Sequence, residues 1–438
     1  MRRLVFAFMV ALLCGCAMRP AAKPSPNPLQ QIRQQIHKGQ AGSLSAGAAK
    51  VEITPKVGTP LAGYLKRHGK PSTGIRDPLY VRTLALSDGQ DKLLLISADL
   101  LVFPQPMAER LLKRITKEHS IPRQSIVLAA THTHSGSGGI ATGLLHEQVF
   151  GRYDPDLEEG IASRTLWSVR QALERLKPVQ WGHSREGEIL RGFVENRADP
   201  QGPVDAGLSV LVFSEPKEGM RAIVVNASAH PTLLDSQDMR LSADYTGEVC
   251  RRLETDYPGS ICLFLNGAAG NERPSDSIGG NGEERVERFG GLLAEAASAL
   301  AGRAELRTAG DLAAWGGWFD LPEPQIHFGP VPIHPQIGRR MRPSSVYLNL
   351  AALDGLLLVP FPAEPTTEIA AAFTQKLATV GKQALLFGYA NGYLGYAVTP
   401  KQYESKTYEA TMTWYGPDFG QVLENHLLLL AGMLEGKE

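Results

Sequence analysis

The chain has 438 residues, of which 43% are hydrophobic, and this is enough apolar material to bury a large core. Lys plus Arg and Asp plus Glu balance at 45 each, so no basic excess points to a nucleic-acid partner and no acidic excess to a disordered tail. The chain contains only 11 histidines, which makes any clustering of them informative.

Residues 1–16 have the layout of a bacterial export signal. Two arginines precede an apolar stretch that is shorter than the roughly 20 residues of a membrane-spanning helix. The stretch ends in Leu13-Cys14-Gly15-Cys16, which resembles a lipobox, so we expect Cys16 to be lipidated. An ordinary secretory signal with incidental cysteines is the alternative. The first interpretation predicts an exported, membrane-anchored lipoprotein that faces the periplasm or the cell exterior.

Residues 17–45 are rich in proline and polar residues at their start, and they predict a flexible linker between the membrane and a single domain over 46–438. After export, Cys250 and Cys262 would be the remaining cysteines. Because Cys262 lies in an apolar strand, two buried thiols are favoured over a disulfide between them.

Apolar runs alternate with amphipathic segments through the rest of the chain, and the sequence shows no internal repeat. The predicted strands are 92–101, 124–131, 220–229, 259–270, 355–361 and 382–391. The predicted helices are 105–119, 156–176, 243–257 and 366–380. Residues 320–345 are proline-rich and show neither the helical nor the strand spacing of apolar residues, so they predict a long surface loop or cover. The pattern predicts an α/β fold with a mixed β-sheet core and flanking helices.

Most polar residues of interest directly follow predicted strands. They are His132 and His134, His230, Asn266 and Asn271, Glu364, and Tyr393 and Tyr396. Ligands of α/β sheets bind beyond the carboxyl ends of strands, where loops converge. The sequence therefore predicts one shared active-site pocket at that edge.

The side-chain types suggest a metal. In extended backbone His132 and His134 would point to the same face, and Pro231 biases His230 towards an extended conformation. Glu364 is expected at the start of a helix, where the dipole favours a carboxylate. Two imidazoles, a carboxylate and an open position form a catalytic zinc set, although a His-x-His spacing by itself is common.

Several longer stretches resemble the catalytic domain of the neutral/alkaline non-lysosomal ceramidase family. They are AGAAKVEITPKVGTPLAGY, GIRDPLYVRTLAL, LLLISADLL, LAATHTHSGSGG, NASAHPT and GYANGYLGYAVTPKQYESKTYEA, which span residues from about Ala46 to about Gly420. The resemblance implies a zinc-dependent amidase that acts on the N-acyl bond of ceramide or of a related lipid or small molecule.

The resemblance also implies residue roles. It makes His132, His230, Glu364 and Tyr396 the zinc ligands, and it makes His134, Arg197 and Tyr408 catalytic. Asp99 is a candidate for orienting a ligand histidine, with a helix cap as the alternative.

Two departures from the family pattern concern the substrate. The family has an active-site serine in a Gly-Asn/Asp-x-Ser-Pro loop, whereas this chain reads Gly270-Asn271-Glu272-Arg273-Pro274, and the chain leaves no room for the family's C-terminal immunoglobulin-like domain. Asn271 and Arg273 are therefore expected to bind substrate, with Arg273 meeting either a substrate anion or a neighbouring acid. An esterase on the same site and a non-catalytic binding lipoprotein remain the alternatives.

Overall fold

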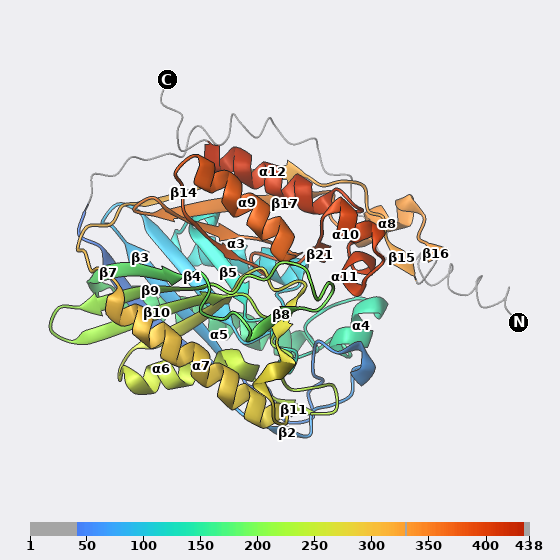
Figure 1. Ribbon diagram of the computed structural model, residues 1–438, viewed down its shortest axis with the longest axis horizontal. Coiled ribbons are helices and arrows are strands. Elements are labelled where there is room, and N and C mark those ends of the chain that lie inside the picture. Colours follow the sequence, from blue (N-terminus) through green and yellow to red (C-terminus); the bar gives the residue numbers. More distant parts are fainter. Residues whose placement is uncertain (1–41, 329–330, 433–438) are drawn as a thin grey trace, which may run out of the picture.

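The structure is a computed structural model that describes residues 42–328 and 331–432 (Figure 1). The predicted export signal with Cys16, and the linker as far as residue 41, lie outside the described residues. Leu44 is already fully buried, and β1 begins at Ser45. No helix in the described ranges is both long enough and apolar enough to cross a membrane.

Three sheets with the same topology form the core. In each sheet the first three strands are antiparallel in sequence order, and a helix then crosses over to a fourth strand that is parallel to the third. The first unit contains β1 (Ser45–Glu52), β3 (Tyr80–Ser87), β4 (Lys92–Ala98), α3 (Gln105–His119) and β5 (Ile126–Ala130). The second contains β7 (Gln180–Glu186), β9 (Leu208–Glu215), β10 (Gly219–Ala227), α6 (Asp244–Asp256) and β12 (Ile261–Asn266). The third contains β14 (Leu312–Asp320), β17 (Ser345–Leu353), β18 (Leu356–Pro360), α9 (Thr367–Thr379) and β20 (Ala384–Phe387).

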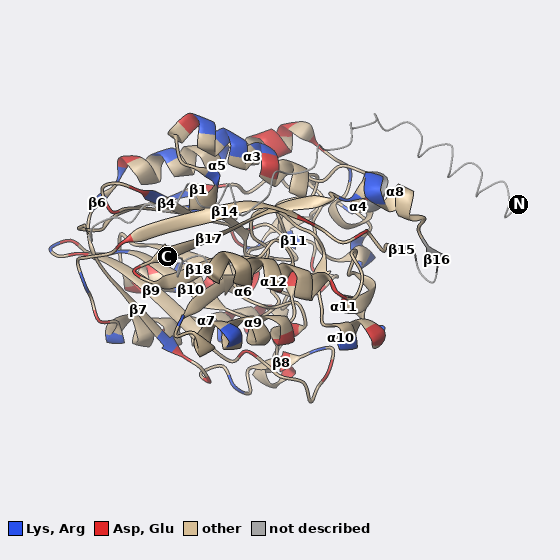
Figure 2. Ribbon diagram, turned by 90° about the horizontal axis from the view of Figure 1, so that it is seen from above, with Lys and Arg blue, Asp and Glu red and all other residues tan. Residues whose placement is uncertain are grey.

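A second helix completes each unit and packs beside the crossover helix on the outer face of its sheet. These helices are α5 (Pro155–Glu174), α7 (Gly282–Arg303) and α12 (Phe419–Gly432). Figure 1 shows the α9–α12 and α6–α7 pairs on opposite sides of the molecule, and Figure 2 shows the α3–α5 pair on a third side. Charges of both signs alternate along the outer surfaces of α3 and α5 in Figure 2.

The inner faces of the three sheets share one core. On β4, Leu93 and Leu95 point into this shared core, while Leu94 and Ile96 point outward under α3 and α5. The third strands β10 and β18 alternate in the same way. Because both faces of each sheet are covered, these strands are continuous apolar runs, which is why the sequence revealed them.

The predicted α/β class is confirmed, and every predicted strand and helix corresponds to an observed one with ends shifted by a few residues. The threefold repetition is one of topology and was not visible as a sequence repeat. The prediction of a long loop without regular structure over 320–345 is partly wrong. This segment contains β15 (His327–Phe328), β16 (Val331–Pro332) and α8 (Pro335–Met341). Cys250 and Cys262 are buried free thiols, as predicted.

The connections from first to second strand are long in all three units and cover 53–79, 187–207 and 321–344. They carry the 3-10 helix η2 (Leu65–Arg67) and β2 (Gly74–Ile75), then β8 (Val194–Asn196), then β15, β16 and α8. β2 pairs with β11 (Arg240–Leu241), and the short strand β6 (Lys177–Pro178) extends the first sheet. The short helices α4 (Leu144–Phe150), α8, α10 (Pro400–Glu404) and α11 (Tyr408–Thr411) gather at one end of the molecule, at the right of Figure 1. This is the end to which the polar loops after the third and fourth strands lead.

Candidate metal centre and active site

His132 follows β5 and is held by its backbone and by its ring. Its φ of 70° lies in the left-handed region, so the expected extended backbone is absent at this residue. The Nδ1 atom lies 2.7 Å from the carbonyl oxygen of Leu101, which can only accept, so Nδ1 carries the proton and Nε2 presents a lone pair. The ring of Tyr389 stacks on the imidazole with centroids 3.8 Å apart.

His230 follows β10 and is fully buried. Its Nδ1 lies 2.8 Å from the carbonyl oxygen of Ala269, which leaves Nε2 as the free lone pair in this ring too. The two Nε2 atoms of His132 and His230 lie 3.1 Å apart. Two units of the fold therefore direct lone pairs at the same point.

Glu364 comes from the third unit. It lies in the short strand β19 (Glu364–Pro365), which pairs with β21 (Tyr396–Ala397), so the expected place at a helix start is wrong: α9 begins only at Thr367. Its Oε2 atom is buried and has no hydrogen-bond partner among the described residues, and it lies 3.3 Å from His132 Nε2 and 3.9 Å from His230 Nε2. Tyr393 donates its hydroxyl proton to Oε1 and so fixes the carboxylate.

The electrostatics of these groups suit a cation. Burial lowers the pKa of His230 well below its usual value, and the nearby Arg197 adds to this effect, so the imidazole is neutral at pH 7. Burial raises the pKa of Glu364, but the contact with His132 and the tyrosine hydrogen bonds lower it by more. The net effect is a lowered pKa, and the carboxylate stays ionised. Zinc bound at about 2.0–2.1 Å in tetrahedral geometry places its ligand atoms roughly 3.3 Å from one another. Two converging lone pairs and an unpartnered carboxylate oxygen at these separations fit such an ion.

His134 also reaches this point but is held differently. Its Nε2 lies 3.1 Å from that of His230, and the three imidazoles together form a possible metal-binding group. However, its buried Nδ1 has no hydrogen-bond partner in the described part of the chain, whereas metal-bound histidines almost always donate this proton to an acceptor. His134 is also only half-buried, and its ring packs against Tyr64. These differences separate it from His132 and His230.

Arg197 and Tyr396 lie together beside the centre. The Arg197 Nη2 donates to the Tyr396 hydroxyl at 3.0 Å and to the Gly270 carbonyl at 2.7 Å, and its Nε donates to buried Glu409 at 2.9 Å. Burial raises the pKa of Tyr396 well above its usual value, Glu364 adds to this effect, and the Arg197 guanidinium opposes it. Tyr408 is 60% exposed, and its ring centroid lies 5.8 Å from that of Tyr396 and 6.0 Å from the Arg197 guanidinium carbon. The structure thus brings all seven predicted metal and catalytic residues to one region, while their roles stay predictions.

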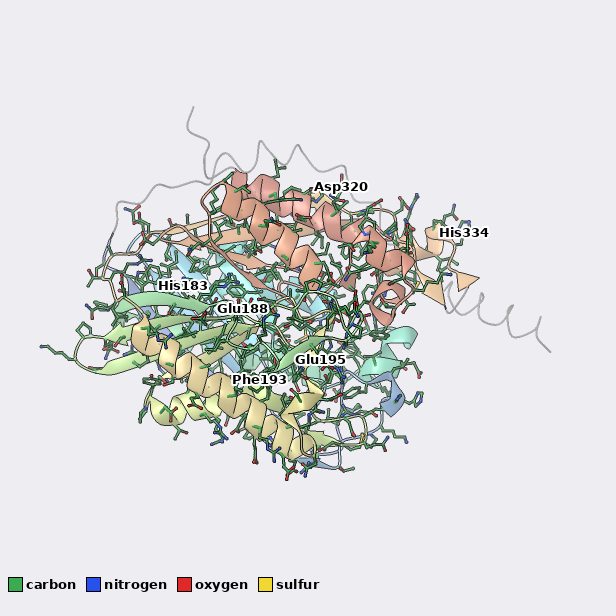
Figure 3. All side chains as sticks on the ribbon, viewed as in Figure 1. His183, Glu188, Phe193, Glu195, Asp320 and His334 are labelled. Carbon is green, nitrogen blue, oxygen red and sulfur yellow. The ribbon has the colours of Figure 1, made fainter. Side chains whose placement is uncertain are left out.

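Asn271 and Arg273 are engaged with the protein. The Asn271 side-chain oxygen accepts a hydrogen bond from the backbone N–H of Thr367, and its amide nitrogen donates to the Glu368 carboxylate. Both partners lie at the start of α9. Arg273 lies in β13 (Glu272–Pro274), paired with β8, and forms ion pairs with Glu195 at 2.6 Å and Asp276 at 3.0 Å. Glu195 is labelled in Figure 3. The structure favours the ion-pair alternative for Arg273, and the substrate role of both residues stays a prediction.

Asp99 does not orient a histidine and does not cap a helix. It accepts from the backbone of Tyr80 and forms a buried ion pair with Arg82 at 2.7 Å. The carbonyls of Leu101 and Ala269 do the orienting, and a sequence cannot single out a carbonyl for this. Tyr389 and Glu409 were also missed, although Tyr389 lies within the same GYAN run that led to Tyr393.

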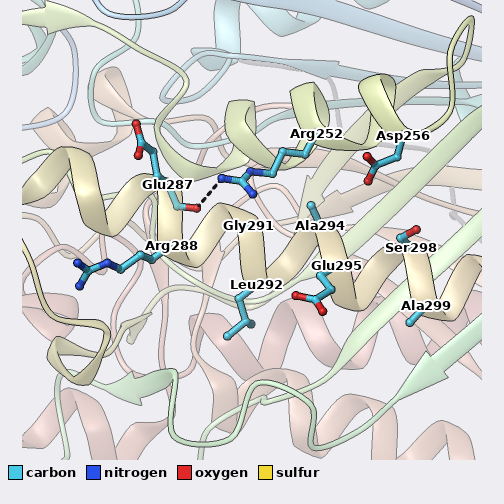
Figure 4. A pocket seen from close by; sticks show the side chains of 10 residues that line it. All are labelled: Arg252, Asp256, Glu287, Arg288, Gly291, Leu292, Ala294, Glu295, Ser298 and Ala299. Carbon is cyan, nitrogen blue, oxygen red and sulfur yellow. Dashed lines mark hydrogen bonds between the residues drawn. The ribbon is translucent and has the colours of Figure 1, made fainter.

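A separate surface groove lies on the α6–α7 face (Figure 4) and contains none of the residues discussed so far. Its Arg252 is bound to Glu248 at 2.6 Å and to the Glu287 carbonyl at 3.3 Å. The rest of its lining mixes acidic residues with Arg288 and small or apolar residues. Nothing in the groove resembles the donor set at the strand ends.

Known proteins resemble this chain both in sequence and in fold. It is 26% identical to a neutral ceramidase of Mycobacterium tuberculosis over 223 residues, which are 47% of this chain and 34% of that protein. It is 22% identical to the neutral ceramidase of Pseudomonas aeruginosa over 470 aligned positions, covering 85% of this chain and 69% of that protein. Two solved structures share the fold: a ceramidase complexed with C2 (TM-score 0.80, 20% identity) and the Pseudomonas aeruginosa neutral ceramidase (TM-score 0.77, 19% identity). Each comparison covers 90% of this chain and 75% of the other.

Residues 44–264 match the family described as "Neutral/alkaline non-lysosomal ceramidase, N-terminal". This is just over half of the chain, and it includes His132, His134, Arg197 and His230. Glu364 and Tyr396 lie outside the matched range, and it is the fold that carries them to the same point. Sequence, topology and the arrangement of the histidines agree, and the chain belongs to the neutral/alkaline non-lysosomal ceramidase family.

Proposed function

We propose that this protein is a zinc-dependent hydrolase that cleaves a carboxamide, or N-acyl, bond of a lipid or small molecule. The observation that carries the proposal is the convergence of His132 Nε2, His230 Nε2 and Glu364 Oε2 within 3.1–3.9 Å of one another. Each comes from a different unit of the fold, and each is left without a proton at the shared point.

In this proposal His132, His230, Glu364 and Tyr396 hold the zinc ion. The ion would polarise the scissile carbonyl and lower the pKa of bound water towards about 7. The Leu101 and Ala269 carbonyls fix the two imidazoles, and Tyr393 fixes the carboxylate.

His134 handles the proton. Burial lowers the pKa of His134 well below its usual value, and its neighbour His132 adds to this effect, so the ring is neutral and able to accept. It is less buried than His132 and His230, which leaves it the most accessible of the three imidazoles to a substrate. A neutral imidazole there can take a proton from water and return it to the leaving amine.

Arg197 and Tyr408 stabilise the negative charge that develops on the carbonyl oxygen. Glu409 and Gly270 lock the guanidinium in place before substrate binds, so little reorganisation is needed at the moment of reaction. Tyr408 is exposed beside it and contributes a hydroxyl donor.

The direct test is metal analysis combined with matched N-acyl and O-acyl substrates that share one acyl chain. Preferential hydrolysis of the amide by the zinc-loaded protein supports the proposal. Faster cleavage of the ester would favour the esterase alternative, and stoichiometric zinc without turnover of either would favour a binding lipoprotein.

We also propose that the protein is exported and anchored through lipid on Cys16. The support is the charged and then apolar layout of residues 1–16. Labelled fatty acid should be incorporated by the full chain and not by Cys16→Ser. Equal labelling of both would refute the anchor.

A further inference from the structure

Each of the three long first-to-second-strand connections brings an arginine to the site end of the molecule. Arg67 lies in the first connection, Arg197 in the second and Arg342 in the third. The three side chains differ in what neutralises or solvates them, and this difference is informative.

The first two guanidinium groups are fully engaged. Arg67 is buried among backbone carbonyls, including those of His134, Asp235 and Asp238, the last two at 3.0 and 2.7 Å. Arg197 is paired with Glu409 and hydrogen-bonded to Tyr396. Neither has spare capacity for a ligand anion beyond the chemistry already described.

Arg342 has no such partner. Across the ranges that the structure describes, it makes no ion pair with a carboxylate, and its buried Nε has no hydrogen-bond partner. Its Nη1 lies 3.4 Å from His146 Nε2, and its guanidinium carbon lies 3.3 Å from the centroid of the Trp414 ring. Burial lowers the pKa of Arg342 to about 10, which still leaves it charged at neutral pH. A guanidinium whose Nε is shielded from water normally meets an anion.

The surroundings of Arg342 connect it to the metal centre. Trp414 packs edge-on against Tyr393 with ring centroids 5.5 Å apart, and Tyr393 holds Glu364 through its hydroxyl. Arg342, Trp414, Tyr393 and His146 are all half-buried, so a bound molecule can touch them. We call these four residues the Arg342 cluster.

The cluster is built rather than incidental. The Arg342 backbone N–H donates to the Gly338 carbonyl and so ends α8. The Tyr415 hydroxyl donates to the carbonyl of the next residue, Pro343, at 2.9 Å. The Gln325 N–H donates to the Trp414 carbonyl at 2.8 Å, which ties the third connection to the C-terminal segment. The basic residues of α8, seen in blue in Figure 2, are Arg339 and Arg340, and Arg339 is paired with Glu323 at 2.6 Å.

We infer that the Arg342 cluster binds an anionic group of the substrate, a carboxylate or a phosphate, while the N-acyl bond lies at the metal centre. This inference rests on the proposed function. An open guanidinium over a tryptophan ring offers paired N–H donors to such a group. Arg273, the residue that the sequence suggested for this task, is already neutralised by Glu195 and Asp276. The matched control is Arg339, which lies on the same connection as Arg342 and is paired with Glu323 at 2.6 Å.

The test uses two pairs of substrates in which a terminal carboxylate is replaced by a neutral group. N-dodecanoylglycine is compared with neutral N-dodecanoylglycinamide, and the mono-N-butylamide of adipic acid is compared with neutral N-butylhexanamide. The first pair carries the carboxylate on the amine side of the scissile bond and the second pair carries it on the acyl side. The wild type should prefer the anionic member of at least one pair.

For that pair, Arg342→Gln should lower kcat/KM of the anionic substrate by about 10–100-fold, the range expected for a charge-assisted hydrogen bond, and leave the neutral one within about twofold. Arg342→Lys should recover part of the loss, and the control Arg339→Gln should change neither substrate's kcat/KM. Equal losses on both members, or no preference in either pair, would overturn the inference. If the wild type cleaves no amide, the proposed function fails, and calorimetric binding of N-dodecanoylglycine against its glycinamide still decides the role of Arg342.

Discussion

The Nε2 atoms of His132 and His230 face each other at 3.1 Å. Neither carries a proton, because the Nδ1 atom of each ring holds the proton and donates it to a backbone carbonyl. Two lone pairs at this distance repel, and the Oε2 atom of Glu364 adds negative charge beside them. A cation between these atoms turns each repulsion into an attraction. In the proposed metal site, the protein thus holds the three atoms in place ahead of the ion.

The first prediction concerns metal content. Purified protein should contain about one zinc per chain, and His132→Ala and His230→Ala should each lose it, because each variant removes one of the two imidazoles of the proposed ligand set. Plasma emission spectroscopy measures the ratio. The control is His183→Ala, in β7 at the other end of the molecule (Figure 3). Full occupancy in the double variant His132→Ala/His230→Ala would show that the ion lies elsewhere.

Removal of the metal should also affect stability. Ligand present at 100 times its dissociation constant stabilises the folded state by about 2.7 kcal/mol, so a chelator should lower the Tm and added zinc should restore it. Differential scanning calorimetry measures this. An unchanged Tm in a sample proved to be metal-free would argue against a site that bridges the three units.

The second prediction separates His134 from the ligands. Because its Nδ1 lacks the orienting acceptor that His132 and His230 have, His134→Ala should keep its zinc. Turnover should fall by about 10²–10⁴-fold with the loss of the proton acceptor. Zinc content and kcat are measured on the same preparation. Loss of zinc together with activity would make His134 a third imidazole ligand.

The third prediction concerns Arg197 and Glu409. Arg197→Gln leaves the buried Glu409 carboxylate unpaired and should lower the free energy of unfolding by about 3–5 kcal/mol. The double variant Arg197→Gln/Glu409→Gln should regain most of this stability, since no buried charge remains. Its kcat should nevertheless stay about 10²-fold or more below that of the wild type, because the oxyanion donor is missing. Urea unfolding and kinetics of the double variant are decisive: recovery of both quantities would reduce Arg197 to a structural role.

The fourth prediction concerns Asp99 and Arg82. Asp99→Asn should destabilise the protein by about 3–5 kcal/mol through the broken buried pair, with zinc content unchanged. Glu159→Gln, which breaks the exposed pair with Arg114, is the control and should cost less than about 1 kcal/mol. If Asp99→Asn instead lost zinc at normal stability, the orienting role first suggested for Asp99 would be restored.

The sequence revealed what depends on apolar periodicity. The inner strands of each sheet are apolar on both faces, as in β4, and the helices that cover them have a clear apolar side. It also placed the histidines after strands. It could not show that His132 adopts a φ of 70°, since the bend that brings His132 and His134 together depends on packing around Leu101 and Tyr389.

Charge pairing was the other limit of the sequence. Nothing along the chain tells that Glu195 neutralises Arg273, 78 positions away, while Arg342 is left without an acidic partner within residues 42–328 and 331–432. Such pairing is decided by which loops meet at the strand ends. The threefold topology was equally hidden, because a repeat of strand order needs no repeat of side chains.

The threefold arrangement has a consequence for how the protein matures. His132 belongs to the first unit, His230 to the second, and Glu364 and Tyr396 to the third. During synthesis the histidines emerge long before the last two proposed ligands, so a nascent chain can offer only an incomplete set of them. The complete site exists only after all three units have closed around their common core, and zinc loading would therefore report that the last part of the chain has docked.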